Sequence, residues 1–379
     1  MTPPLATTPA PDNTVTPDVD ARLTHLVENF VTRRRVHHLN TAIATGDGKL
    51  RWSATCAPVS ADHPLQSRSP FFIASITKRF IITLVIQAHE RDELELSAPI
   101  ASYLPAETVA GLHVLRGVDR TSAITVRHLA SHTSGLPDYF EKRRSGPSLY
   151  EQLRAGRDQA WRFEDVLRIV REQQRPHFVP QDLAAARQKA RYSDTGFQLL
   201  IRIVEAVTGR SLADLLAERI TTPLGLTRTW LPGHPRSVTD TAAPSPLHAG
   251  QRRVELTSMI ESSNDLVSTT GDLLTFQQAL LAGEVFDHTR SVELLTERRN
   301  RLRNIPILRY GLGTMFFDVG RLMSAGRRPL TLVGHSGVTG TWLFHCPELD
   351  LHLTGTVDHT HGQALPFRLM AQILHVWRG

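Results

Sequence analysis

Ser75 and Lys78 are the two residues whose types and spacing most directly suggest a reaction. Lysine is rare in this chain, because only four of its 43 basic side chains are lysines and the others are arginines. Residues three positions apart share a helix face, so the amine of Lys78 can reach the hydroxyl of Ser75. Unlike arginine, a buried lysine can become neutral near pH 7 and accept a proton. We therefore interpret Ser75 as a nucleophile and Lys78 as its base.

Tyr192, in the triplet Tyr192-Ser193-Asp194, is the next candidate. The triplet stands just before a segment, 197–207, whose apolar residues repeat at helical spacing. A phenol beside a lysine ammonium has a lowered pKa, so it could exchange a proton with a serine or with a leaving group. The alternative interpretation is a tyrosine that packs between two parts of the fold.

A glycine within an apolar strand marks the third candidate segment, His335-Ser336-Gly337-Val338. Glycine at such a position allows a ligand or another backbone to approach closely. The backbone N–H groups of Val338 and Ser75 could then form an oxyanion hole, in which two donors meet the charge that develops on an attacked carbonyl. A purely structural role within the strand is the alternative for His335.

The first and last parts of the chain show the alternation of β-strands. Apolar and polar residues alternate over 38–57 around a Gly46-Asp47-Gly48 turn, which predicts a hairpin. Near the other end, the pattern predicts an amphipathic helix at 365–377, preceded by strands at 315–318, 330–334, 341–346 and 351–357.

The segments between these strands have helical spacing. Ser75 begins an apolar helix that continues through Ile86, which places the serine at the positive end of the helix dipole. Further helices are expected at 125–130, 163–172, 197–207 and 211–220. The pattern predicts an α/β (α+β) fold with an antiparallel sheet, built from N- and C-terminal segments and flanked by helices, and an inserted helical lobe. We expect the sheet lobe to comprise 19–74 and 285–379, and the mainly helical lobe 75–284.

Composition limits the class of protein. The chain has 379 residues, which is more than one hydrophobic core usually serves, and 41% of them are hydrophobic. We therefore expect a globular protein with either two lobes or one large two-layer domain. The formal net charge is +6, and most of the excess lies between residues 141 and 191, where twelve Lys and Arg face seven Asp and Glu. No basic motif with interleaved aromatic residues accompanies this charge, so we expect no nucleic-acid partner.

The N-terminus and the cysteines bear on location. Residues 1–18 are rich in Pro and Thr and lack the basic and apolar parts of a signal peptide, so we expect a disordered tail. No stretch approaches the roughly 18 apolar residues of a membrane span, and we expect no membrane partner. Cys56 and Cys346 are too few for a disulfide scaffold. Together these features predict a cytoplasmic protein.

The ordered triplets Ser-x-x-Lys, Tyr-Ser-Asp and His-x-Gly resemble those of the serine β-lactamase and penicillin-binding-protein superfamily. The resemblance is closest to the class C β-lactamase-like branch, which includes family VIII carboxylesterases, D-stereospecific peptidases and transacylases. It extends from about residue 18 to the end of the chain and includes three more segments, 94–105, 124–137 and 266–272. It implies a β-lactamase/transpeptidase-like fold.

Transferred position by position, the resemblance implies acyl transfer through an ester on Ser75. Lys78 would be the base and Tyr192 a proton shuttle, while the substrate would contact Asp194, His335, Ser336 and Gly337. The partners would be a small-molecule acyl donor and, as acceptor, water or an amine or alcohol. No metal or organic cofactor is implied, and the segment from Asp358 to His361 shows too few ligands for a metal site.

Two positions depart from the family's pattern. Asp194 replaces an asparagine, so an amide that can donate gives way to a carboxylate that only accepts when ionised. His335 replaces a lysine that supplies a fixed positive charge near a substrate carboxylate. These changes favour esters over penicillin-type substrates.

The main functional prediction is therefore an esterase-like serine hydrolase acting on an ester or amide of a small molecule. The alternatives are a transacylase in a biosynthetic pathway, a D-aminopeptidase or weak β-lactamase, and a non-enzymatic binding protein.

We expect 138–191 to overhang the cleft as a lid. Its arginines either hold an acidic or phosphorylated substrate or keep the lid soluble; among them are Arg143, Arg144 and Arg154. The sequence makes no prediction of oligomeric state.

Overall fold

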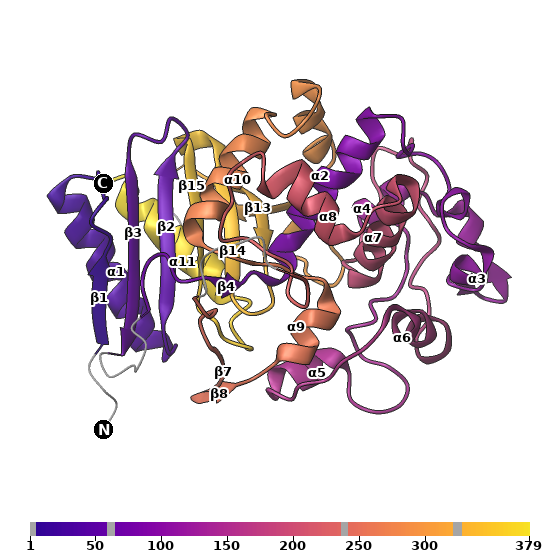
Figure 1. Ribbon diagram of the computed structural model, residues 1–379, viewed down its shortest axis with the longest axis horizontal. Helices are drawn as coiled ribbons and strands as arrows, with labels where there is room; N and C mark the ends of the chain where they lie inside the picture. Colours follow the sequence, from indigo (N-terminus) through magenta and orange to yellow (C-terminus); the bar gives the residue numbers. More distant parts are fainter. Residues whose placement is uncertain (1–4, 59–64, 236–241, 321–327) are drawn as a thin grey trace.

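The computed structural model describes residues 5–58, 65–235, 242–320 and 328–379. Within them lies a nine-stranded antiparallel sheet in the order β1-β3-β2-β15-β14-β13-β12-β11-β10 (Figure 1). Three strands come from the N-terminal part: β1 (Leu5–Pro9), β2 (Leu39–Thr45) and β3 (Arg51–Pro58). Six come from the C-terminal part: β10 (Asn300–Arg301), β11 (Leu308–Tyr310), β12 (Met315–Val319), β13 (Leu330–Ser336), β14 (Thr341–Cys346) and β15 (Leu351–Thr356).

The two ends of the chain meet where β2 pairs with β15, with Ile43 opposite Leu353. Both residues are fully buried, so this pairing joins the two halves inside the core rather than at an exposed edge. The prediction of one antiparallel sheet assembled from N- and C-terminal segments is thereby confirmed.

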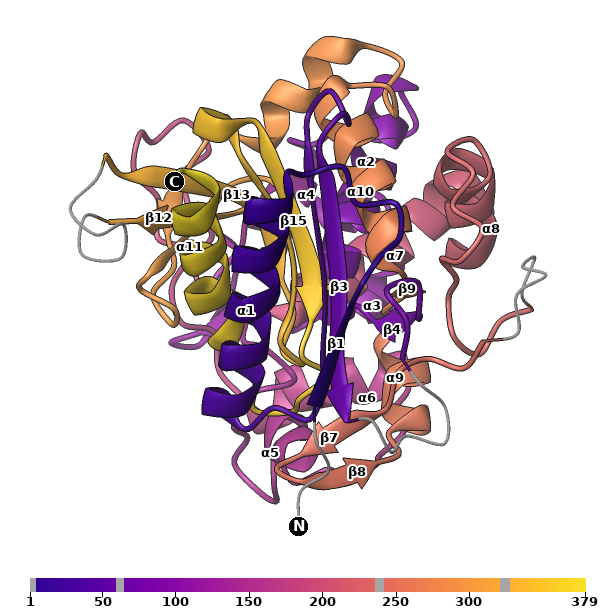
Figure 2. The ribbon, with the colours of Figure 1, turned by 90° about the vertical axis from the view of Figure 1, so that its left-hand side faces the viewer.

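Helices cover both faces of the sheet (Figure 2). On one face α1 (Pro17–Arg34) packs beside α11 (Leu365–Trp377), and on the other α10 (Thr270–Ala282) crosses β14, β15 and β2. Successive side chains of a strand point to opposite faces. Trp342 and Phe344 of β14 accordingly join the core beneath α1 and α11, whereas Leu343 joins the core on the α10 side.

The rest of the chain between the sheet segments is mainly helical. Its longest helices are α2 (Thr77–Glu90) and α7 (Asp194–Thr208), which pack against each other. Shorter helices are α3 (Ala106–Val109), α4 (Val126–Ala130), α5 (Leu149–Arg154), α6 (Phe163–Arg168), α8 (Leu212–Leu216) and α9 (Thr257–Ser263). Three strand pairs are small: β4 (Phe71–Phe72) with β9 (Val267–Ser268), β5 (Val114–Leu115) with β6 (Val118–Asp119), and β7 (Leu247–Ala249) with β8 (Arg252–Val254).

The structure corrects the prediction of a disordered tail over residues 1–18. Residues 1–4 lie outside the described part, but Leu5–Pro9 forms β1, paired with β3, and α1 begins at Pro17. Threonine suits the pleated edge of a sheet, and proline suits the first turn of a helix. The Pro/Thr-rich composition thus indicated disorder, although the same residue types serve an edge strand and a helix start.

The boundary between the predicted lobes is also less simple than expected. Helix α10 lies within the segment 75–284 that was assigned to the helical lobe, yet it packs on the sheet. Its Phe276 stacks on Phe80 of α2 at 3.7 Å between ring centroids, with 10° between the ring planes. Helix α10 therefore connects the two parts through one core. Among the described residues, no helix combines the length and apolar character that a bilayer crossing requires.

We expect Phe276→Ala to destabilise the protein by about 3–5 kcal/mol, because it leaves a cavity between α2, α10 and the sheet. Val118→Ala, at a position 50% exposed, should change stability by less than about 0.5 kcal/mol. Urea denaturation followed by circular dichroism measures both values. Equal stability of the two variants would show that α10 does not connect the layers.

Candidate active site

Ser75 lies in a single 3₁₀ turn, Ala74–Ile76, that leads directly into α2. Ala74 has a φ of 48°, a left-handed conformation that is uncommon for residues other than glycine. The hydroxyl of Thr341 at the start of β14 donates to the carbonyl of Ile73 at 3.0 Å. A Cβ at Gly337 would lie 2.1 Å from Thr341 Oγ1 and 2.8 Å from the Ala74 side chain. Glycine is therefore required here for the β13–β14 connection to close against the serine turn.

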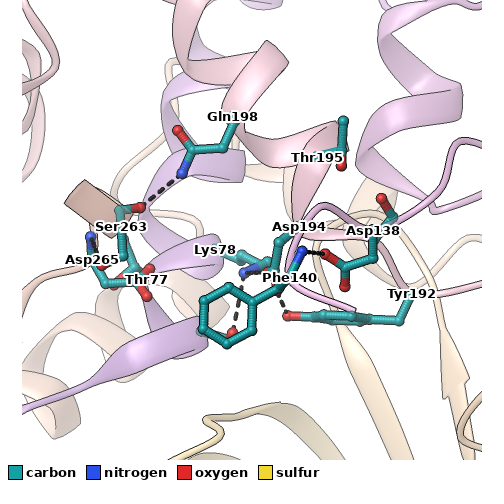
Figure 3. A network of polar contacts seen from close by, with 12 residues as sticks. Thr77, Lys78, Asp138, Phe140, Tyr192, Asp194, Thr195, Gln198, Ser263 and Asp265 are labelled. Carbon is teal, nitrogen blue, oxygen red and sulfur yellow. Dashed lines mark hydrogen bonds and ion pairs between the residues drawn. The ribbon is translucent and has the colours of Figure 1, made fainter. Parts of the chain in front are cut away.

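Lys78 contacts both Ser75 and the carboxylate of Asp194, and Figure 3 shows Lys78 beside Asp194. Its Nζ lies 3.1 Å from Ser75 Oγ and 2.5 Å from Asp194 Oδ1, and its side chain is only 5% exposed. The first contact comes from the one-turn spacing along α2. The second comes from the packing of α2 on the N-terminus of α7, where Asp194 is the first residue and a negative charge is favourable.

Tyr192 lies on the other side of this pair. Its hydroxyl donates to Asp194 Oδ1 at 3.4 Å, and its ring centroid is 5.4 Å from Lys78 Nζ. Asn304 holds the tyrosine backbone from both sides, accepting from its N–H at 3.0 Å and donating to its carbonyl at 3.2 Å. Ser75, Lys78, Tyr192 and Asp194 thus meet at one place.

The protonation states differ from those expected from the sequence. Burial lowers the pKa of Lys78, but the carboxylates of Asp194 and Asp265 raise it, and the net pKa lies above the usual value. Burial and the charge of Asp194 raise the pKa of Tyr192 well above 10, although a hydrogen bond with Ser75 opposes the shift. At rest the lysine is therefore an ammonium and the tyrosine a neutral phenol. Both shifts have the opposite sign to the prediction, and the carboxylate at position 194 contributes to both.

Two further aspartates approach the same group. Burial and the charge of Asp194 raise the pKa of Asp138 well above its usual value. Burial raises the pKa of Asp265 to about 6, while Lys78 opposes and Asp194 reinforces that shift. One ammonium cannot neutralise three carboxylates, so these two aspartates lose their protons at higher pH than usual. The surroundings of Ser75 become more negative as the pH rises through about 6, where Asp265 ionises.

These groups line one cavity of about 470 Å³. Ser336, Gly337 and Val338 line it as well, so the candidate oxyanion donors Ser75 and Val338 face the same space. Most of the wall is apolar or aromatic, including Phe72, Tyr139, Phe140, Trp161, Phe197 and Met315. Among the described lining residues the acids are Asp138, Glu141, Asp194 and Asp265, and the single base is Lys78.

A profile of the beta-lactamase family matches residues 23–374. The chain belongs to the beta-lactamase family. Penicillin-binding protein 4 of Amycolatopsis lactamdurans is 33% identical over 213 residues, which are 53% of this chain and 47% of that protein. The matches with three of the curated relatives span 47%, 65% and 51% of those relatives' own lengths.

Solved structures show the same fold. A D-stereospecific amidohydrolase from Streptomyces sp. superimposes with a TM-score of 0.71 at 23% identity, covering 93% of this chain and 97% of its own. EstCE1, a hydrolase with promiscuous acyltransferase activity, does so with a TM-score of 0.72 at 18% identity, covering 94% and 98%. The predicted β-lactamase/transpeptidase-like fold is therefore confirmed.

His335 is the candidate residue of this beta-lactamase-family chain that the structure separates from the others. It is fully buried and does not line the cavity. Its Nδ1 lies 2.9 Å from the carbonyl of Ser336, so it donates there, and its Nε2 lies 3.0 Å from the hydroxyl of Tyr310 and accepts from it. Burial and the charge of Lys78 lower its pKa well below the usual value, so the ring is neutral. The imidazole supports the strand behind the site and has no free nitrogen for a substrate.

The segment 138–191 does contribute to the cavity, but with other side chains than expected. Tyr139, Phe140, Tyr150, Leu153 and Trp161 line it, together with Asp138 and Glu141. The three arginines singled out in this segment lie elsewhere: Arg143 donates to the carbonyl of Pro147, Arg144 lies outside the lining, and the Arg154 guanidinium is 5.7 Å from the ring centroid of Tyr150. The positive charge of the lid therefore does not line the cavity.

Sequence reasoning missed Asp138, Asp265 and Asn304. The two aspartates adjoin segments that carry the family resemblance, Asp138 directly after 124–137 and Asp265 directly before 266–272. This adjacency was a usable signal, because residues next to segments that meet in the fold are themselves expected to lie close to that meeting point. Nothing in the sequence around Asn304 indicates its clamp on Tyr192.

Asp194→Asn should lower the pKa of Lys78, because it removes the nearest of the carboxylates that stabilise the ammonium. The four lysines make this measurable: with [¹³Cε]-lysine labelling the spectrum contains four signals, and Lys78→Arg identifies the relevant one. Asp47→Asn is the matched control, since Asp47 pairs with exposed Lys49 at 3.1 Å and should leave the Lys78 titration unchanged. An unchanged Lys78 titration in Asp194→Asn would refute the proposed coupling.

Proposed function

We propose that the protein is a serine hydrolase that forms an acyl-enzyme on Ser75 from an ester or amide of a small molecule. The observation that carries the proposal is the 3.1 Å contact between Lys78 Nζ and Ser75 Oγ on the wall of a largely apolar cavity. Membership of the beta-lactamase family supports it. Two proteins with the same fold also support it, one an amidohydrolase and the other a hydrolase with acyltransferase activity.

The reaction requires a proton to leave Lys78 before the lysine can act as a base. We propose that it moves to Asp194 Oδ1, 2.5 Å away, which converts the ion pair into a neutral amine and a carboxylic acid. The amine then takes the Ser75 proton while Oγ forms its bond to the substrate carbonyl. The backbone N–H groups of Ser75 and Val338 would stabilise the negative charge on the carbonyl oxygen.

Collapse of this intermediate breaks the bond to the leaving group, which takes a proton from Lys78 or from the Tyr192 hydroxyl. Water then attacks the ester on Ser75 and passes a proton to whichever of these groups gave one to the leaving group. The bond between Ser75 Oγ and the acyl carbon breaks, Oγ takes that proton, and the acid is released. The proton on Asp194 finally returns to the Lys78 amine, which restores the ion pair. Neutral Tyr192 suits the donor role, because a phenol with a raised pKa keeps its proton until a more basic leaving group forms.

The charge of the cavity favours uncharged or cationic substrates over anionic ones. Four acids and one base line it, and Glu141 is paired with Arg191 at 2.5 Å. A substrate carboxylate would meet these acids, while the one cation of the described lining, Lys78, is already paired with Asp194 and His335 is neutral and buried. A substrate ammonium would contact carboxylates and the faces of aromatic rings, and both kinds of group attract cations. The proposal that the arginine-rich lid selects acidic substrates receives no support from this lining.

This acidity favours a second candidate, an amidase or aminopeptidase acting on substrates with a free amino group. The apolar wall keeps the transacylase alternative open as well, since an acceptor alcohol or amine could exclude water from the ester on Ser75. For all of these functions the partners are small molecules.

The free and buried thiols of Cys56 and Cys346 support a reducing, cytoplasmic location as part of the proposal.

A fluorophosphonate probe should label Ser75, as peptide mass spectrometry would show, and Ser75→Ala should abolish the labelling. Lys78→Met should slow the labelling about 10²–10⁴-fold, since it removes the base. The matched control is Lys49→Met, a lysine with an 83% exposed side chain, which should label at the parent rate. Labelling of another serine, or an undiminished rate in Lys78→Met, would disprove the assignment.

Substrate charge should control kcat/KM. Three p-nitrophenyl esters test this, with acyl chains of equal length that end in trimethylammonium, tert-butyl or carboxylate. We expect the cationic ester to be preferred over its neutral isostere and the anionic ester to be poorest. The cationic preference should grow as the pH rises through about 6, where Asp265 ionises. Asp265→Asn should remove this pH dependence, and a preference for the carboxylate ester would overturn the charge argument.

A further inference from the structure

Two histidines and one aspartate, residue types that bind metal ions, meet around the turn between β14 and β15, away from the candidate active site. His345 and His352 stand directly opposite each other in the antiparallel pair, so their side chains share one face of the sheet. Asp350 lies in the connecting turn with a φ of 44°. Thr341, at the other end of β14, contacts the serine turn, and the four-residue separation places His345 about 13 Å farther along the strand.

The spacing of the donor atoms fits one ion. His345 Nε2 lies 3.2 Å from Asp350 Oδ1, and one donor atom from each of the three side chains lies within 4.8 Å of the others. Two ligands of a tetrahedral ion with bonds of about 2.0–2.2 Å are separated by about 3.3 Å. The histidine and the aspartate already have this separation. The third donor would need to move by at most about 1.5 Å.

His352 gives an independent indication of a missing partner. The residue is 3% exposed, and its Nδ1 is buried without a hydrogen-bond partner among the described residues. Buried polar atoms are nearly always paired in native proteins. The hydrogen bond between His345 and Asp350 accounts for those two side chains and leaves His352 unexplained.

The two imidazole rings lie against each other on this face of the sheet. Their centroids are 4.5 Å apart with 29° between the ring planes. A nitrogen of each ring and an oxygen of Asp350 lie within 4.8 Å of one another, so both rings can bind the same ion.

His359 and His361, which are close together in the sequence, both have hydrogen-bond contacts through Nδ1. His359 Nδ1 accepts from the backbone N–H of His361, and His361 Nδ1 lies 3.2 Å from the hydroxyl of Thr360. The carboxylate of Asp358 is bonded to His38 at 2.8 Å and to Thr356 at 2.7 Å. Within the described ranges, three donors from different side chains converge only at His345, Asp350 and His352.

We propose that His345, Asp350 and His352 bind a divalent transition-metal ion, with Zn²⁺ as the best match to two imidazoles and one carboxylate. Asp350 is 66% exposed, so the fourth position is open to water. The ion would connect β14, the turn and β15. It would also reach the β2–β3 turn, because the Asp350 carbonyl accepts from the Gly46 N–H at 3.0 Å. Its role is to stabilise this end of the sheet, independently of the chemistry at Ser75.

Calorimetric titration of Zn²⁺ into tag-free, chelator-treated protein tests the proposal. We expect one ion per chain with a dissociation constant below 100 µM, and a melting temperature that rises with Zn²⁺ concentration. His345→Gln and His352→Gln should weaken binding at least about 100-fold and abolish the thermal shift. The double variant His359→Gln/His361→Gln is the matched control and should bind Zn²⁺ like the parent.

Asp350→Asn keeps the test decisive if a histidine variant unfolds, because Asp350 is exposed and its loss should weaken binding without disturbing the core. The melting temperature of every variant without metal separates lost folding from lost binding. Absence of binding at 100 µM Zn²⁺, unchanged affinity in Asp350→Asn and the folded histidine variants, or equal loss in the control would each overturn the proposal. Removal of the ion should leave labelling of Ser75 unchanged, so this test stands apart from that of the proposed function.

Discussion

The ion pair between Lys78 and Asp194 is the interaction on which the chemistry of this cavity depends. The buried ammonium of Lys78 and the partly exposed carboxylate of Asp194 stabilise each other at 2.5 Å, and removal of Asp194 would leave the ammonium uncompensated in a poorly solvated place. The carboxylate keeps the lysine protonated and discourages ionisation of Tyr192. It also helps to raise the pKa values of Asp138 and Asp265. A single residue type at position 194 thus influences the resting state of all its titratable neighbours.

The scaffold holds this pair through two close approaches. Ser75 lies in the 3₁₀ turn that leads into α2, and α2 carries Lys78 and packs on α7, whose first residue supplies the carboxylate. Gly337 lets the β13–β14 connection reach the serine turn, so that Ser75 and Val338 face one cavity. The sheet therefore positions the backbone donor of Val338, and the helices position Lys78 and Asp194. His345, at the far end of the same β14 strand, is one of the three proposed metal ligands, and an ion there would stabilise the sheet without entering the reaction.

Local patterns in the sequence predicted much of this structure. The hairpin of β2 and β3, the helix that follows Ser75, the C-terminal strands and the final helix all follow from periodicity, because each depends on contacts between near neighbours. The edge strand β1 was missed, since its pairing with β3 spans some 50 residues and its composition indicated disorder. The role of α10 as a connection between layers was also missed, because its contacts with β2, β14 and β15 join segments that are far apart in the sequence.

By itself, the sequence determined the family's fold and the pairing of Ser75 with Lys78, because a spacing of three residues on a helix brings two side chains together wherever that helix lies. Tertiary structure decided which charged and titratable side chains surround the cavity and how they are protonated. It brought Asp138, Asp194 and Asp265 around one ammonium, turned His335 away from the cavity, and kept the lid arginines off the cavity wall. A pKa depends on burial and on every charge nearby in space, and these exist only once distant segments have packed.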